Sequence, residues 1–301
     1  MLPVFSVKHL GRRRPTPTKP PADVKSRLTF TGPMQASGNR SFYGFTEGLS
    51  SGAHVAAPPE WLDPQGRHVV VSIDYRLAPE TKLPAIIEDL RDAYRWLHER
   101  GPGLFRIDPE RIAVTGQSAG GDLTLMSGFA VNPRPRALLE LSGYGDIIRP
   151  WYSRPSPFYQ QQAAVSKEEA SRSVGAACIS APSAEDDRGR YKFYLYCRQH
   201  GIWPQEVADH NPDSDRRWFD SFCPVRNVTP EYPPTVLIHG TADDDVPFDE
   251  SVHMERKLSE IKVKHAFLRV PHGSHCLWKE SPAVKAPIFR KAMDFVDAHM
   301  R

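Results

Sequence analysis

Ser118 lies between glycines in the segment RIAVTGQSAGGDLTLM, at a point where the predicted structure changes. Residues 112–114 are a short β-prone run, and the apolar spacing after the serine predicts a buried helix. Gly116 and Gly120 lack a Cβ and would let strand and helix approach closely. We therefore expect a tight, strained turn that exposes the Ser118 hydroxyl above a helix N-terminus, where N–H groups stabilise negative charge. G-x-S-x-G is the pattern of a nucleophile elbow, although a glycine-rich turn with a serine helix cap has the same five residues.

An activated serine needs a base, and the base needs a group that fixes its tautomer. The stretch VLIHGTADDDVP supplies the candidate acid Asp243, and RVPHGSHCLW supplies the candidate base His275. Each lies in a loop that follows a predicted strand. Serine, acid and histidine in this order along the chain are typical of one arrangement of a catalytic triad.

Neighbouring residues compete for both roles. Asp244 and Asp245 are alternative acids, and we prefer Asp243 because it comes first after the strand and so lies nearest the sheet edge. His272 is the alternative base. His239, at the end of a strand, is expected to be a packed structural histidine.

The elements that would position these residues alternate regularly from His68 onward. The run HVVVSIDY is typical of a strand buried on both faces of a parallel sheet. Strands are predicted at 68–75, 108–116, 136–146, 233–240 and 264–270, and helices at 83–100, after Ser118, at 248–260 and at the end of the chain. This order predicts a mostly parallel α/β sheet with helices on both faces and its site at the carboxyl ends of the strands.

Three stretches, VVSIDYRLAPE, GQSAGGDL and HGTADDDVP, resemble the α/β-hydrolase superfamily, in particular its hormone-sensitive-lipase-like esterase and lipase branch. The resemblance covers residues 68–301. It implies an α/β-hydrolase fold in which Ser118 is the nucleophile, Asp243 the acid and His275 the base. It also implies that the Ala119 N–H is one oxyanion donor, and it favours His275 over His272 because GSH takes the place of the family's GGH.

One family feature is missing from the sequence. Members usually carry an HGGG loop before the DYRLAPE stretch, and its N–H groups complete the oxyanion hole. Here the corresponding region is SFYGFTEGLSSG, in which Gly44, Gly48 or Gly52 would have to substitute. Because loss of one oxyanion donor typically costs about 10²–10³-fold in rate, an intact triad on a slow enzyme is compatible with this sequence.

Composition sets further expectations for the 301 residues. The formal net charge of +3, with both signs interspersed, gives no reason to expect nucleic acid, and no apolar run approaches the roughly 20 residues of a membrane span. We expect a cytoplasmic protein with no metal and no cofactor, whose Cys178, Cys197, Cys223 and Cys276 are reduced thiols. The sequence does not indicate an oligomeric state.

The domain organisation is predicted as follows. Residues 1–60, which include the basic, proline-rich GRRRPTPTKPPADVK, are expected to be irregular and partly disordered. A transit peptide is the alternative, against which the proline density argues. Residues 61–301 form the hydrolase domain, with an insertion at about 149–223 that is rich in aromatic residues and suits a cap over the site. The same aromatic residues are also expected to form a small core of the cap itself.

The sequence thus predicts a cofactor-independent serine hydrolase that cleaves a small-molecule carboxylic ester through an acyl-enzyme. Two alternatives remain at this stage. One is an amide or peptide hydrolase on the same triad. The other is a hydrolase-like binding protein that lacks a complete oxyanion hole.

Overall fold

The computed structural model describes residues 25–30, 68–73, 75–105, 107–172, 174–176 and 184–300. Its centre is a parallel sheet with the strand order β2-β1-β3-β4-β5-β6. The strands are β1 (Lys25–Phe30), β2 (His68–Ile73), β3 (Ile112–Gln117), β4 (Ala137–Leu141), β5 (Thr235–Gly240) and β6 (His265–Val270). The five strands predicted from His68 onward are all present, and each is shorter than its predicted range. The predicted α/β fold is confirmed.

Strand β1 corrects the expectation that residues 1–60 are irregular. Its six residues lie between β2 and β3, with Leu28 paired to Val71 on one side and Val114 on the other. The sequence KSRLTF is short and has apolar residues only at two of six positions, so its pattern gives little sign of a central strand. The rest of residues 1–60 lies outside the described residues.

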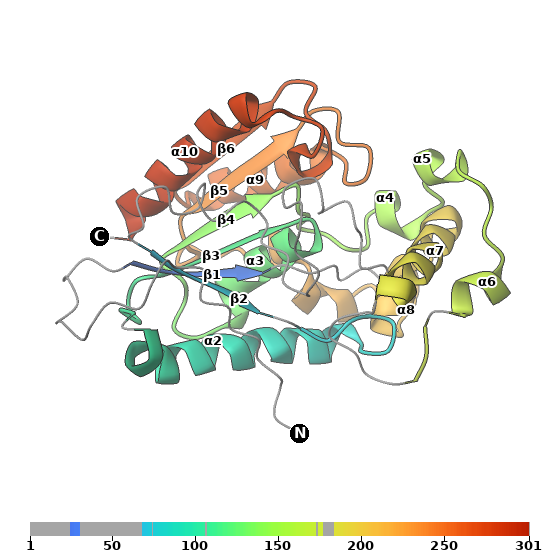
Figure 1. Ribbon diagram of the computed structural model, residues 1–301, viewed down its shortest axis with the longest axis horizontal. Helices are drawn as coiled ribbons and strands as arrows, with labels where there is room; N and C mark the ends of the chain where they lie inside the picture. The colour runs from blue at the N-terminus through green and yellow to red at the C-terminus, as the bar shows by residue number, and fades with distance from the viewer. Residues whose placement is uncertain are drawn as a thin grey trace.

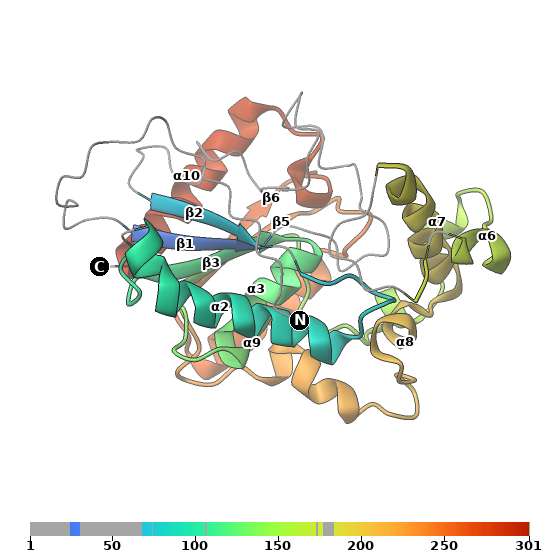
Figure 2. The ribbon, with the colours of Figure 1, turned by 60° about the horizontal axis from the view of Figure 1, so that its bottom comes forward.

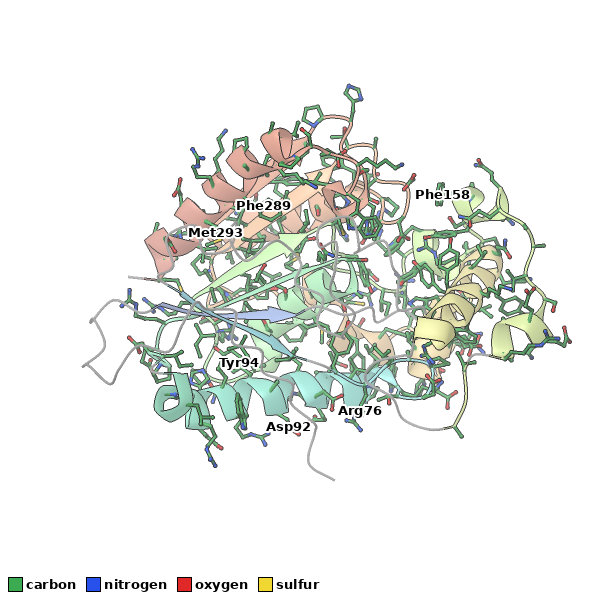
Figure 3. All side chains as sticks on the ribbon, in the orientation of Figure 1. Arg76, Asp92, Tyr94, Phe158, Phe289 and Met293 are labelled. Atoms are coloured by element: carbon green, nitrogen blue, oxygen red, sulfur yellow. The ribbon has the colours of Figure 1, made fainter. Side chains whose placement is uncertain are left out.

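Helices cover both faces of the sheet, as the alternating pattern predicts (Figures 1 and 2). Helices α2 (Leu83–Phe105), α3 (Ala119–Ala130) and α9 (Asp249–Ile261) lie on one side, and α10 (Pro282–His299) lies on the other. In Figure 3, Tyr94 of α2 and Phe289 and Met293 of α10 lie on the sides of their helices that face the sheet, whereas Asp92 lies on the far side of α2. The sheet is therefore buried between two layers of helix.

Successive residues of the central strands contribute to opposite cores. Val114 and Leu138 pack on the α2–α3–α9 side, while their neighbours Ala113 and Leu139 pack on the α10 side. Every residue of β3, β4 and β5 is buried. Such burial on both faces is why these strands read as continuous apolar runs.

The segment between β4 and β5 begins with a group of helices that lies beyond the carboxyl ends of the strands (Figures 1 and 2). It contains α4 (Pro150–Ser153), α5 (Pro157–Gln160), α6 (Lys167–Ser171), α7 (Ala184–His200) and α8 (Trp203–Ala208), followed by the 3₁₀ helices η2 (Trp218–Phe222) and η3 (Pro224–Arg226). We call residues 150–208 the cap. It lies within the predicted insertion at 149–223.

The cap aromatics pack largely on one another. Tyr194 lies 5.3 Å from Trp203 between ring centroids, and Trp151 stacks on Tyr152 at 4.1 Å. Phe158, by contrast, is 37% exposed and lies at the upper edge of the cap in Figure 3. These contacts support the expectation that the aromatic residues form a core within the cap.

Candidate functional site

Ser118 occupies the corner between β3 and α3. Its backbone angles, φ 53° and ψ −122°, lie outside the regions usual for a residue with a side chain, so the turn is strained. A Cβ added at Gly116 would lie 2.2 Å from the carbonyl oxygen of Gly120, which shows why the strand and helix can meet only with glycine here. The predicted strained turn is present. The prediction that the Ser118 hydroxyl is exposed is wrong, because the residue is only 5% exposed.

His275 connects Ser118 to Asp243. Its Nε2 lies 3.0 Å from Ser118 Oγ, and its Nδ1 lies 2.8 Å and 3.0 Å from the two carboxylate oxygens of Asp243. An ionised carboxylate can only accept hydrogen bonds, so Nδ1 of His275 carries the proton and donates it in the hydrogen bond to Asp243. In the neutral imidazole, Nε2 is then free to accept the Ser118 hydroxyl proton. The structure brings together the three residues that the sequence singled out.

Asp243 and His275 each stabilise the charged form of the other. Burial alone would raise the pKa of Asp243, but the charge and hydrogen bond of His275, together with those of His239, hold that pKa well below its usual range. Burial likewise opposes charge on His275, yet the carboxylate of Asp243 is the largest of the effects that raise the pKa of the imidazole well above its ordinary value. The site therefore favours the imidazolium that general-base catalysis creates.

Two loops hold Asp243 and His275 in register. A Cβ at Gly240 would lie 2.1 Å from the carbonyl oxygen of Gly273, so the two backbones touch. The Ala242 N–H donates to the Gly273 carbonyl at 3.0 Å. The Ser142 hydroxyl, directly after β4, accepts a hydrogen bond of 3.1 Å from the main-chain N–H of Cys276, the residue next to His275. These contacts fix the loop after β6 against the loop after β5.

His239, expected to be a packed structural histidine, is buried and in addition contacts Asp243. It is fully buried, and its Nε2 lies 3.1 Å from Asp243 Oδ2 and 3.0 Å from the Val246 carbonyl. Because a carbonyl can only accept, Nε2 carries a hydrogen that is shared with the Asp243 carboxylate. Its Nδ1 is held by the Ser251 hydroxyl at 2.7 Å. The spacing of four residues between His239 and Asp243 was the available sign of this pairing.

The structure separates the competing candidates. His272 is exposed, and its main-chain N–H donates to the Thr241 hydroxyl at 2.8 Å. Asp244 is 40% exposed at its side chain and lies 3.8 Å from Lys279 Nζ. Asp245 is buried and lies 3.6 Å from His275 Nε2, on the other nitrogen from Asp243. In the described part of the chain, Asp243 is the one of these three aspartates that is hydrogen-bonded to Nδ1 of His275.

Ala119 is the first residue of α3, where backbone N–H groups have no acceptor within the helix. It follows Ser118 directly and is buried. This position is compatible with the predicted oxyanion donor. The region SFYGFTEGLSSG, with Gly44, Gly48 and Gly52, lies outside the described residues.

Other expected features concern cofactors, thiols and membranes. Among the described residues, no group of histidine, cysteine, aspartate and glutamate side chains is arranged to hold a metal ion. Cys197, Cys223 and Cys276 are buried free thiols, and Cys178 lies outside the described part of the chain. No described helix combines the length and the apolar character that crossing a membrane requires.

Comparisons with known proteins agree with this geometry. Residues 64–279 match the sequence profile of the alpha/beta hydrolase fold family. Esterase LipC of Mycobacterium tuberculosis is 26% identical over 269 residues, which cover 88% of this chain and 55% of LipC. Carboxylesterase NlhH of the same organism is 54% identical over 56 residues, which cover 19% of this chain and 17% of NlhH. The chain thus spans about half of LipC and a smaller part of NlhH.

Solved structures show the same fold. The acetyl ester-xyloside bifunctional hydrolase of Caldicellulosiruptor lactoaceticus superimposes with a TM-score of 0.62 at 18% identity, covering 99% of this chain and 97% of that one. A Staphylococcus aureus protein of unknown function gives a TM-score of 0.68 at 19% identity, covering 99% and 94%. At these identities the likeness concerns the fold.

Proposed function

We propose that this chain, which belongs to the alpha/beta hydrolase family, is a serine esterase that cleaves a small-molecule carboxylic ester. The profile match also confirms the resemblance to the hormone-sensitive-lipase-like branch of that family. The observation that carries the proposal is the continuous hydrogen-bonded path from Ser118 Oγ through His275 to Asp243. Relatives named as esterases and carboxylesterases support the choice of an ester over another substrate.

In the first half of the reaction, Ser118 Oγ attacks the ester carbonyl while its proton moves to His275 Nε2. Asp243 keeps its proton-free carboxylate against Nδ1 and balances the imidazolium charge. The imidazolium then gives the proton to the departing alkoxide, and the acyl group stays on Ser118. The Ala119 N–H, at the start of α3, is proposed to stabilise the oxyanion.

In the second half, His275 takes a proton from water, which attacks the acyl-enzyme. Collapse of the second tetrahedral intermediate releases the carboxylic acid and returns the proton to Ser118 Oγ. None of these steps uses a cofactor. Ser118, His275 and Asp243 therefore account for the proton transfers of the cycle, and Ala119 for one oxyanion donor.

Hydrolysis of p-nitrophenyl acetate and butyrate by purified protein and by Ser118→Ala tests this proposal. We expect turnover by the unchanged protein and loss of that turnover in the variant. Equal rates from the two folded proteins would contradict the esterase assignment and favour a hydrolase-like binding protein. Both proteins are checked for folding by circular dichroism.

A further inference from the structure

A second carboxylate lies beside the nitrogen of His275 that faces the nucleophile. Asp245 Oδ2 is 3.6 Å from His275 Nε2, which is the atom 3.0 Å from Ser118 Oγ. The Asp245 side chain is only 7% exposed. Its main-chain N–H also donates to Asp243 Oδ1 at 3.0 Å. One loop therefore places a carboxylate near each nitrogen of the imidazole.

Helix α7 of the cap holds Asp245 in this position. Tyr194 Oη donates to Asp245 Oδ1 at 3.0 Å, and Arg198 Nη1 donates to the same oxygen at 2.8 Å. Arg198 Nη2 also donates to the main-chain oxygen of Asp245 at 3.1 Å. Because these side-chain bonds go to Oδ1, Oδ2 is the oxygen that lies toward His275.

Arg198 is itself fixed. Its side chain is 2% exposed, and its guanidinium carbon lies 4.6–5.5 Å from the ring centroids of four cap aromatics, Trp151, Tyr152, Tyr159 and Tyr194. Aromatic faces attract a cation at such distances. A buried charge held by an aromatic cage and by one carboxylate has little freedom to move. The position of Asp245 therefore depends on the cap.

We propose that Asp245 is a positioning residue for His275, and that its ion pair with Arg198 couples the cap electrostatically to the reaction centre. The inference rests on the proposed esterase function and extends it. When the Ser118 proton moves to His275 Nε2, the nearby Asp245 charge stabilises the imidazolium, while Arg198 offsets part of that charge. Asp245 takes up no proton in this step and forms no bond to the substrate.

Several titratable groups act on His275 from the elements around it. They are Asp243 and Asp245 from the loop after β5, Glu140 from β4, and the adjacent Cys276, while His239 of β5 acts on Asp243 from behind. Asp243 has the largest effect among those that favour the imidazolium, followed by Cys276 and then by Asp245. Substitution of Asp245 should therefore shift the titration of His275 without abolishing it.

A simpler role for the ion pair is to anchor the cap. Anchoring alone predicts changes in stability or KM, with no change in the pH at which the base titrates. The coupling predicts that removal of the negative and the positive member moves that pH in opposite directions. The pH profile therefore separates the two roles.

The test measures kcat/KM for p-nitrophenyl butyrate against pH in Asp245→Asn and in the matched control Asp244→Asn. The control removes the same charge one residue away, from a side chain 40% exposed beside Lys279. We expect the acid limb of Asp245→Asn to move to lower pH by about one unit, since one nearby opposite charge is lost. The control should overlay the unchanged protein. An unmoved limb in folded Asp245→Asn would overturn the proposal.

Arg198 supplies the second arm. Arg198→Gln should move the acid limb to higher pH, and the charge-conserving Arg198→Lys should return it toward the unchanged profile. Movement of the Gln variant in the same direction as Asp245→Asn would overturn the coupling. If either single variant fails to fold, the double variant Asp245→Asn with Arg198→Gln leaves no unpaired buried charge, and its limb should still lie below that of the unchanged protein.

Ser118→Ala, assayed in parallel, distinguishes failure of the proposed esterase function from failure of the proposed coupling. If it retains full turnover, the proposed function fails and the profiles report on another nucleophile. If it loses turnover while Asp245→Asn keeps the unchanged profile, only the coupling fails.

Discussion

The backbones of Gly240 and Gly273 touch so closely that a Cβ on Gly240 would meet the Gly273 carbonyl oxygen at 2.1 Å. Gly240 ends β5, and Gly273 lies two residues before His275. This contact therefore sets the distance between the loop that carries the acid and the loop that carries the base. A side chain at this point would separate them.

We predict that Gly240→Ala lowers both stability and activity. The overlap is with backbone, which cannot rotate away, and overpacking of this kind typically costs about 1–3 kcal/mol. Thermal unfolding and kcat/KM for p-nitrophenyl butyrate measure the two effects. Gly103→Ala is the control, because outside its own turns of helix no described atom lies within 4 Å of its added Cβ, and alanine is favoured in a helix. A Gly240→Ala protein as stable and active as the control would contradict the assigned role.

The two histidines of the loop after β6 should differ sharply. We expect His275→Ala to lower kcat by about 10⁴-fold or more, since a triad without its base keeps only residual activity. His272→Ala should keep kcat within about twofold, because this side chain is exposed and only its main-chain N–H makes the contact with Thr241. Steady-state kinetics on both variants provides the measurement. The reverse pattern would overturn the assignment of the base.

Activity should depend on pH through His275. The pKa of this imidazole is raised above its usual value of 6.5, against the effect of burial, by Asp243 and other nearby groups. Only neutral His275 can accept the Ser118 proton, so the rate is highest above the raised pKa and falls as the pH drops through it. We expect the midpoint of the acid limb of kcat/KM above pH 6.5. A midpoint below that value would show that burial lowers the pKa of His275 by more than the nearby carboxylates raise it.

Asp243→Asn should lower kcat by roughly 10⁴-fold, as removal of the acid from a triad does when the histidine loses its tautomer. The amide cannot balance the imidazolium, and it also loses the charge that His239 faces. Asp244→Asn is the matched control and should leave kcat unchanged. Comparable losses in both variants would remove the distinction between these two aspartates.

A buried ion pair joins α7 to the segment after β2. Arg190 Nη1 and Nη2 donate to the two carboxylate oxygens of Glu80 at 2.6 Å and 2.8 Å, and both side chains are at most 2% exposed. We predict that Glu80→Gln destabilises the protein by about 3 kcal/mol or more, since it removes the negative member of a buried ion pair with Arg190. Glu169→Gln, which breaks the exposed pair with Lys192, should cost no more than about 1 kcal/mol. Urea unfolding measures both.

The same pair predicts a dependence of stability on pH. Burial would raise the pKa of Glu80, but the hydrogen bonds of Arg190 and the Gly175 N–H lower it overall. A depressed carboxyl pKa adds stability above its unfolded value of 4.5, and this contribution is lost as the pH falls through the folded pKa. Glu80→Gln should therefore be less stable than the unchanged protein at neutral pH. It should also lose less stability as the pH falls below 4.5. Parallel curves for the two proteins would contradict this assignment.

The sequence predicted the parts of this structure that depend on local pattern. Runs such as IAV in β3 and TVLI in β5 are apolar because both faces of these strands are buried, and the strained turn at Ser118 follows from glycines two positions away on either side. The positions of Asp243 and His275 follow from their places just after strands, because parallel strands bring such loops to one edge.

The features missed by sequence depend on contacts between distant segments. Strand β1 enters the sheet between β2 and β3, and its order cannot be read from a six-residue segment that is mostly polar. Arg198 reaches Asp245 across 47 residues of chain, so no spacing indicates their pairing. The burial of Ser118 was missed because the motif determines the turn and not what surrounds it.

Covalent labelling with a fluorophosphonate, located by mass spectrometry of peptides, is the most direct test of the central claim that Ser118 is a nucleophile activated by His275. We predict a single adduct on the peptide that contains Ser118, no adduct in Ser118→Ala, and much slower labelling in His275→Ala. Absence of an adduct on the folded protein, or an adduct on another serine that persists in Ser118→Ala, would contradict the account.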